Sequence, residues 1–247
     1  MSFDFSRTPL ASTTPLKPDE VHLWRVDLSE TDPSALRTGP LSETETTRYN
    51  RFHREADARR FAARRVALRY ILAAYLDCTP ANVGFEAQDA AGKPTLAHPR
   101  RDALVFNASS SADVALIAVA KTGSLGVDVE RARPIEDMEK IAERFFTRTE
   151  TAHLKAQRPD RITNAFYRIW TSKEALLKAA GTGLPGGLDR FEVSTDPARA
   201  PALLRDAKGG AFHLYPADPA AGYFGALAAD TADLRVVRFA FDPADVP

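Results

Sequence analysis

The chain has 247 residues, 44% of them hydrophobic, which is enough for one large domain or two small ones around a proper core. Lysine plus arginine and aspartate plus glutamate both number 33, so no overall charge favours nucleic acid or an anionic membrane. The single cysteine, Cys78, excludes an internal disulfide framework and a cysteine-built metal site, and fits a reducing compartment.

The N-terminus lacks the continuous apolar run of a signal peptide. The longest apolar run, Val114 to Ala120, is too short to span a bilayer. We therefore expect a cytoplasmic protein that binds neither nucleic acid nor a membrane.

Residues 21–28 alternate between apolar and polar side chains and predict a first strand. Helical character then dominates from about residue 42 to 76, on which Phe61, Leu68 and Leu72 mark an apolar face. This segment is markedly basic and contains Arg48, Arg51, Arg54, Arg59, Arg60, Arg64, Arg65 and Arg69. Such a concentration could bind phosphate, or it could be a solvated helix surface paired with acidic neighbours, and both interpretations stay open.

Short strand patterns follow the helical segment. Residues 83–86 predict a strand, and residues 91–94 predict a turn that presents Lys93. We expect a strand to end at Asn107, a loop of small hydroxylated residues from Ala108 to Ala112, and a buried strand over residues 114–120.

The segment Gly126-Val127-Asp128-Val129-Glu130 alternates strictly between apolar and acidic residues. In a strand the two valines would face the core, and the two carboxylates would share the opposite face with Cα atoms about 6.6 Å apart. Two carboxylates on one face repel, so a metal ion or an arginine should lie between them. The alternative is an exposed edge strand whose acids are solvated.

Helices are predicted over residues 135–146, 149–156 and 161–180, the last ending at Gly181. Strands are expected over residues 191–194, 211–215, 223–229 and 234–241. Each half thus has a long helix followed by short strands. We expect an α+β protein of two pseudo-symmetric halves with a seam near residues 121–125.

The helix over residues 161–180 carries the second candidate group. Lys173 falls within its apolar stripe, so its ammonium should reach an acidic partner or backbone carbonyls. Glu174 and Lys178 lie one turn apart on the flank of the stripe, as an ordinary surface pair or as part of a site. Together with Asp128 and Glu130, Glu174 would complete an all-oxygen ligand set, which suits Mg²⁺ shared with a substrate phosphate or pyrophosphate.

These residues resemble a known family. The segment 126–130, the run Trp170-Thr171-Ser172-Lys173-Glu174-Ala175, Lys178 and the run 181–184 resemble the 4′-phosphopantetheinyl transferases of the surfactin-synthetase-activating type. Further similarity, in order and spacing, extends from about residue 45 to 195. Either acidic motif alone would be a weak signal, whereas the pair with its flanking motifs is a strong one.

The resemblance implies an enzyme that transfers the phosphopantetheine arm of coenzyme A to a serine of an apo acyl or peptidyl carrier protein, releasing 3′,5′-ADP. It implies two subdomains, each a long helix on a small, mostly antiparallel sheet, within residues 1–123 and 124–247, and a protein that acts as a monomer. Asp128, Glu130 and Glu174 would hold Mg²⁺, for which Mn²⁺ could substitute. Glu174 would also accept the serine proton, and Lys178 would stabilise charge on the phosphates.

For coenzyme A itself the resemblance implies contacts with its adenine and phosphates from Arg54, Arg60, Arg64, Lys93, Asn107 and Ser109, besides Lys178. The family loop usually reads Asn-x-Ser-His-Ser, and here Ser110 stands in the place of the histidine. We therefore expect weaker coenzyme A binding or compensation by a nearby arginine. Two alternatives stay open, namely a non-catalytic module that binds coenzyme A and carrier proteins, and a Mg²⁺-dependent phosphohydrolase.

Overall fold

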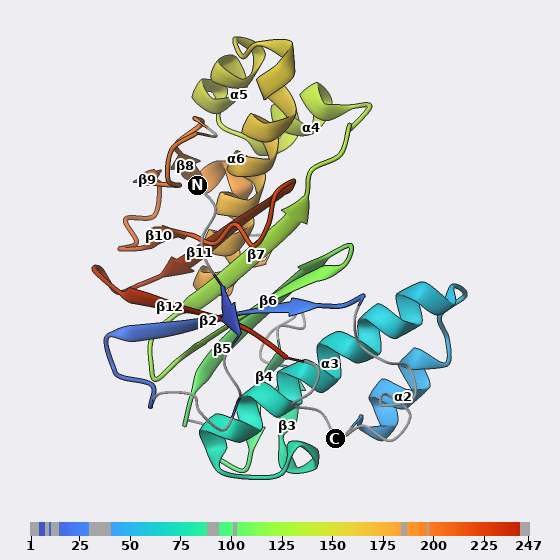
Figure 1. Cartoon of the computed structure of the whole chain (residues 1–247). Helices are drawn as coiled ribbons and strands as arrows, with labels where there is room; N and C mark the ends of the chain where they lie inside the picture. Colours follow the sequence, from blue (N-terminus) through green and yellow to red (C-terminus); the bar gives the residue numbers. More distant parts are fainter. Residues whose placement is uncertain are drawn as a thin grey trace.

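The computed structural model describes residues 5–7, 10, 15–29, 41–87, 94–100, 103–183, 187–196 and 198–242. None of the helices in these residues is both long and apolar enough to cross a membrane. In chain order, and with the labels of Figure 1, the elements are β1 (Ser6–Arg7), β2 (Glu20–Asp27), α2 (Glu43–Tyr49), α3 (Glu55–Leu76), η2 (Pro80–Asn82), β3 (Gly84–Ala87), β4 (Pro94–His98), β5 (Val105–Ser111), β6 (Val114–Ala120), β7 (Leu125–Arg131), α4 (Met138–Phe145), α5 (Arg148–Lys155), α6 (Pro159–Ala180), η4 (Leu188–Arg190), β8 (Phe191–Val193), β9 (Leu203–Asp206), β10 (His213–Pro216), β11 (Tyr223–Ala229) and β12 (Arg235–Ala240).

The larger sheet has five strands in the order β1-β12-β2-β6-β5. Strand β12 is parallel to both of its neighbours, and β6 is antiparallel to β2 and to β5. Helix α3 covers one face of this sheet, where Trp24, Ile71, Leu72 and Ile117 are fully buried in one cluster. Burial of this apolar surface is the main force that holds the long helix on the sheet.

The smaller sheet has three antiparallel strands in the order β10-β11-β7. Helix α6 packs on it through a second cluster that contains Ile169, Leu176, Ala226 and Ala228. The opposite face of this sheet meets the larger sheet in a third cluster, which contains Leu23, Leu116, Val127, Val129 and Leu227. The layers are therefore α3, the five-stranded sheet, the three-stranded sheet and α6 (Figure 1).

The α+β fold with one long helix in each half confirms the predicted fold class. The strand predicted over residues 21–28 is β2, and the helix predicted to stop at Gly181 is α6, which Gly181 ends in the left-handed conformation with φ 65°. The predicted helical stretch over residues 42–76 is two helices, because the chain leaves helical geometry between Tyr49 and Glu55.

Several details of the prediction were wrong. Residues 108–111 are not a loop but the second half of β5, which pairs with β6 along its whole length. Serine hydroxyls do not interrupt a ladder of backbone hydrogen bonds, so composition alone misled the assignment. The helix predicted from residue 135 begins at Met138, and the strands β1, β4 and β9 were not predicted.

The boundary between residues 123 and 124 stays a prediction. Strand β12 comes from the C-terminal part of the chain and yet is hydrogen-bonded between β1 and β2. The end of the chain thus ties the two halves together.

Candidate functional site

The two acidic residues of β7 lie on one face of the strand, as the alternation predicts. Val127 and Val129 are fully buried between the two sheets, while Asp128 and Glu130 point to the other side. That side is not open to solvent at Asp128, which is only 5% exposed. The alternative of an exposed edge with two solvated acids therefore does not hold for Asp128.

Gly126 sets how closely α6 lies to these carboxylates. A Cβ atom at this position would stand 2.1 Å from the carbonyl oxygen of Ala175 and 2.4 Å from the backbone nitrogen of Ala179. Only glycine allows the backbone of α6 to come so close to β7. The contact places Glu174 and Lys178, which flank Ala175 and Ala179 on the helix, beside the acidic face of the strand.

Lys178 makes the central ion pair of the site. Its Nζ lies 2.7 Å from Asp128 Oδ1, and it also donates to Ser109 Oγ and to the carbonyl of Val127, both at 3.1 Å. Ser109 Oγ in turn donates to the same Asp128 oxygen over 2.8 Å. The other oxygen, Asp128 Oδ2, is buried and has no hydrogen-bond partner among the described residues.

The carboxylates of Glu130 and Glu174 share the same electrostatic environment. Burial raises the pKa of Glu174 above its ordinary value, the charge of Asp128 raises it further, and Lys178 opposes this. Burial also raises the pKa of Glu130, against a hydrogen bond from Ser111, and Asp128 again adds to the rise. The charge of Asp128 therefore acts on both glutamates.

The carboxylates are nevertheless not arranged as a preformed cage. Across the described parts of the chain, no three acidic, histidine or cysteine side chains come close enough together to hold a metal ion. The chemistry of the donors still fits a hard divalent cation: three carboxylates repel one another, and one buried oxygen lacks a partner. The three-carboxylate metal site stays a prediction that these donors support.

A pocket of about 430 Å³ opens between α2, α3, β4 and β5. Its lining is Thr44, Glu45, Arg48, Phe61, Arg64, Arg65, Leu68, Pro94 and Ala108. Arg65 forms an ion pair with Glu45 at 2.5 Å, whereas Arg48 and Arg64 make no ion pair with any residue that the structure describes. The pocket is thus positively charged on balance and suits an anion.

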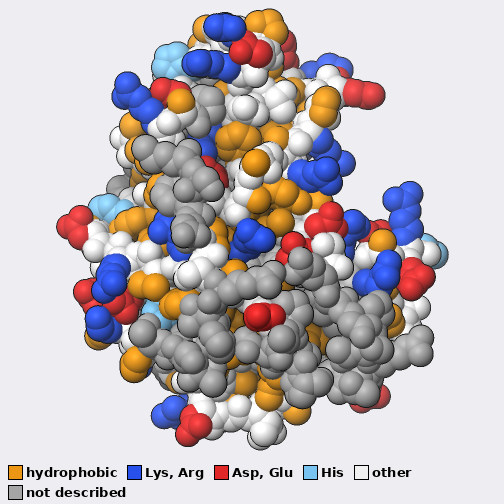
Figure 2. Space-filling view, in the orientation of Figure 1, with side chains coloured by type: hydrophobic (Ala, Val, Ile, Leu, Met, Phe, Trp, Pro, Cys, Tyr) orange, Lys and Arg blue, Asp and Glu red, His pale blue; other side chains and the backbone are white. Residues whose placement is uncertain are grey.

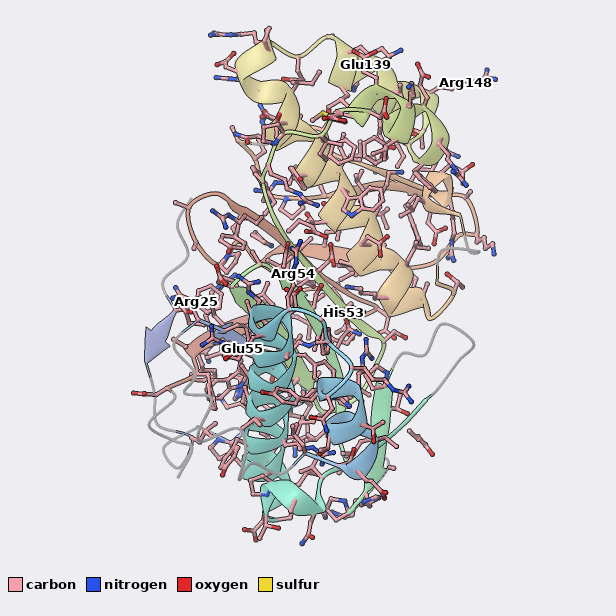
Figure 3. All side chains as sticks on the ribbon, turned by 90° about the vertical axis from the view of Figure 1, so that its right-hand side faces the viewer. Arg25, His53, Arg54, Glu55, Glu139 and Arg148 are labelled. Atoms are coloured by element: carbon pink, nitrogen blue, oxygen red, sulfur yellow. The ribbon has the colours of Figure 1, made fainter. Side chains whose placement is uncertain are left out.

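The three predicted arginines differ in where they lie. Arg64 lies in the pocket, and its Nη1 is 3.4 Å from Ser110 Oγ. Arg60 is held by Asp113, 2.8 Å away, and by Asp57. Arg54 is exposed at the start of α3, at the waist between the two halves (Figure 3).

The remaining predicted contacts of coenzyme A stay untested. Asn107 accepts a hydrogen bond from the backbone nitrogen of Val127 over 2.8 Å, which joins β5 to β7. Ser109 is engaged with Asp128 and Lys178, and Lys93 lies outside the described residues. Figure 2 shows the surface hollowed between the lobe of α4 to α6 and the lobe that carries α2 and the start of α3.

Two family models match consecutive segments of the chain. Residues 31–122 match the N-terminal model of 4′-phosphopantetheinyl transferases, and residues 124–228 match the model of the 4′-phosphopantetheinyl transferase superfamily. The 4′-phosphopantetheinyl transferase HetI of Nostoc is 40% identical over 192 residues, which cover 76% of this chain and 79% of that protein. The chain belongs to the 4′-phosphopantetheinyl transferase family.

A further sequence relative agrees with this assignment of the transferase. The 4′-phosphopantetheinyl transferase Sfp of Bacillus subtilis is 31% identical, with 62% of this chain and 71% of that protein covered. Among solved structures, the holo-[acyl-carrier-protein] synthase of Thermotoga maritima matches with a TM-score of 0.34 and 27% identity over 43% of this chain and 61% of that chain. The assignment to the family rests on the sequence matches.

Sequence reasoning missed Ser111 of the transferase, and it named Arg48 in the basic segment without choosing it among the candidate contacts of coenzyme A. Ser111 Oγ donates to Glu130 Oε2 over 2.6 Å, and Arg48 lines the pocket without having been singled out. Had β5 been recognised as a strand, the spacing of Ser109 and Ser111 would have placed both hydroxyls on the face of Asn107. For Arg48, the sequence carries no signal that separates it from the other arginines.

Proposed function

We propose that the transferase moves the 4′-phosphopantetheine arm of coenzyme A to a serine hydroxyl of an apo acyl or peptidyl carrier protein, with Mg²⁺ as its cofactor. The serine oxygen forms a bond to the phosphorus atom that carries the arm, the bond from that atom to the bridging oxygen of the pyrophosphate breaks, and 3′,5′-ADP leaves. The observation that carries this proposal is the cluster of Asp128, Glu130, Glu174 and Lys178 beside a basic pocket.

The cofactor would be held by Asp128, Glu130 and Glu174. When bound, Mg²⁺ neutralises pyrophosphate charge and makes 3′,5′-ADP a better leaving group. The unpartnered Oδ2 of Asp128 and the mutual repulsion of the three carboxylates support this assignment. Mn²⁺, which also prefers oxygen ligands, is expected to substitute.

Glu174 is assigned as the group that accepts the serine proton. Burial and the charge of Asp128 raise the pKa of Glu174, and Lys178 opposes this, so in the absence of the cation its carboxylate is a stronger base than that of an ordinary glutamate. Lys178 is assigned to the phosphates, because its ammonium lies between β7 and α6 and can stabilise negative charge that develops beside Asp128.

The nucleotide end of coenzyme A is assigned to the basic pocket. Arg64 is the preferred contact among the three predicted arginines, since Arg60 is engaged by two aspartates and Arg54 is exposed. The contact between Arg64 and Ser110 supports compensation for the missing histidine of the family loop. The family resemblance implies a monomer, and the single cysteine, Cys78, fits a reducing compartment, so we further propose a monomer in the cytoplasm.

The test is to incubate the protein with coenzyme A, Mg²⁺ and a panel of apo carrier proteins and to measure each carrier by mass spectrometry. Transfer adds the mass of the arm to at least one carrier. Release of 3′,5′-ADP with no carrier present would indicate a phosphohydrolase instead. Coenzyme A binding with neither product would indicate a binding module.

The carboxylates are tested by Glu174→Ala and Asp128→Ala. Each variant should lose about 100-fold or more in transfer rate while its circular dichroism stays that of the wild type, since each loses a base or a metal ligand. Asp160→Asn is the matched control, because Asp160 is an exposed acid on the same helix, 3.0 Å from the Nε of Arg158. Robust transfer by either alanine variant contradicts the assigned roles.

A further inference from the structure

The two faces of β5 contact different parts of the site. Asn107, Ser109 and Ser111 face β7, where they bond to the Val127 amide, to Asp128 and to Glu130. Ala108 lies in the pocket, and Ser110 contacts Arg64 of the pocket. One strand therefore meets the carboxylates with one face and the anion pocket with the other.

The hydrogen bonds of Ser111 leave its hydroxyl a single orientation. Its Oγ accepts a hydrogen bond from the backbone nitrogen of Arg131 over 3.1 Å. A hydroxyl has one proton, and here it lies toward Glu130 Oε2, 2.6 Å away. Since the partner is the backbone of β7, the hydroxyl is anchored to the same strand that carries the carboxylate.

Ser109 is oriented by the same logic. The ammonium of Lys178 has only donors, so Ser109 Oγ must accept from it, at 3.1 Å. The proton of Ser109 is then directed to Asp128 Oδ1, 2.8 Å away. Asp128 Oδ2 is left buried without a partner in the described structure.

We propose that Ser111 and Ser109 are positioning residues of the predicted metal site: each holds one oxygen of a β7 carboxylate, which leaves the second oxygen for the divalent cation. Ligand carboxylates are commonly fixed by such outer hydrogen bonds, and loss of one weakens metal binding 10-fold to 100-fold. The proposal rests on the proposed function, because it takes Asp128 and Glu130 as metal ligands. It differs from the sequence prediction, which gave Ser109 a role toward coenzyme A alone and Ser111 none.

The test is calorimetric titration of Mn²⁺, and then Mg²⁺, into the full chain saturated with coenzyme A. We expect Ser111→Ala to raise the metal dissociation constant about 10-fold or more, and Ser109→Ala to raise it as well. Ser110→Ala is the matched control from the opposite face of the same strand. It should weaken coenzyme A binding and leave the metal dissociation constant within about twofold of the wild type.

Two larger residues separate positioning from simple loss of fold. Ser111→Thr keeps the hydroxyl, whereas Ser111→Val has nearly the same volume as Ser111→Thr but a methyl group in place of the hydroxyl. We therefore expect the Ser111→Thr protein to bind metal with the affinity of the wild type and the Ser111→Val protein to bind it more weakly. Equal metal affinity in these two variants, or an unchanged affinity in Ser111→Ala, overturns the proposal. If instead the wild type binds no metal and modifies no carrier, the proposed function itself has failed, which is a different outcome.

Discussion

The environment of Arg64 favours the binding of an anion. Burial lowers the pKa of its guanidinium, and the charges of Arg65 and Arg48 lower it further. A cation in such surroundings gains from an anion more than a solvated arginine would. Its hydrogen bond to Ser110 is weak at 3.4 Å, so this hydroxyl does not by itself offset the cost of burying the guanidinium beside two other arginines.

Replacing Arg64 should weaken coenzyme A binding. Arg64→Met removes a charged donor from the pocket, which should cost about 1.5–3 kcal/mol, or roughly 10-fold to 150-fold in the dissociation constant measured by calorimetry. Arg60→Met should cost less, because Arg60 is already paired with Asp113.

Ser110 provides the complementary variant. Ser110→His restores the residue of the family loop and should tighten coenzyme A binding in the Arg64→Met background more than in the wild type. Equal dissociation constants for the wild type and Arg64→Met would show that Arg64 is not the compensating residue.

At the scale of elements, the packing of α6 on β7 builds the site. The interior of α6 is fixed by Lys173, whose fully buried ammonium lies 2.7 Å from Glu150 and donates to the carbonyl oxygens of Leu188 and Phe191. This confirms the prediction that Lys173 reaches an acid or backbone carbonyls. The same helix then presents Glu174, the next residue, toward β7.

Gly126→Ala tests this packing. The added Cβ would overlap the backbone of α6, which cannot turn aside as a side chain would, so the helix must shift. We expect a loss of about 1–3 kcal/mol in the free energy of unfolding, measured in urea, and a fall in transfer rate larger than that loss explains.

Gly209→Ala is the control for Gly126→Ala. Gly209 has φ 70° with nothing within 4 Å of its Cβ position, so an alanine there adds backbone strain far from the packing of α6 on β7. It should reduce stability and leave transfer by the folded protein unchanged. A normal transfer rate in folded Gly126→Ala would show that the close approach of α6 is not needed.

At the scale of the whole molecule, one buried histidine makes folding depend on pH. His22 is fully buried under α3, where its Nδ1 lies 2.7 Å from Tyr75 Oη. Burial lowers the pKa of His22 below 6.5, and the nearby charge of Glu20 opposes only part of this effect. The folded chain therefore binds a proton at this site less readily than the unfolded chain does.

Stability should consequently fall under acid conditions. Above the unfolded pKa of about 6.5, His22 is unprotonated in both states and does not change the stability. As the pH falls below this value, the unfolded state gains the proton and the folded state does not. The free energy of unfolding therefore decreases until the pH reaches the folded pKa of His22. Urea midpoints between pH 8 and pH 5 measure this. His22→Gln should flatten the dependence in this window, and an unchanged slope in that variant would mean that another group is responsible.

The sequence alone determined much about this protein. Periodicity located the long helices and most strands, because amphipathic patterns reflect local geometry. The motifs around Asp128 and Glu174 identified the family. These two acidic groups are about forty residues apart, and that they hold one metal ion together stays a prediction.

Only the tertiary structure decided which groups actually touch. Residues 108–111, predicted as a loop, pair with β6 as part of β5, whose serines contact Asp128 and Glu130. The pairing of β12 with β2 in the larger sheet could not be predicted from the local sequence pattern. Composition did not show which arginine of α3 is the best candidate for binding coenzyme A. In the structure Arg60 forms an ion pair with Asp113, whereas Arg64 lines the pocket. Such choices depend on contacts between residues distant in sequence, and those contacts exist only once the layers have packed.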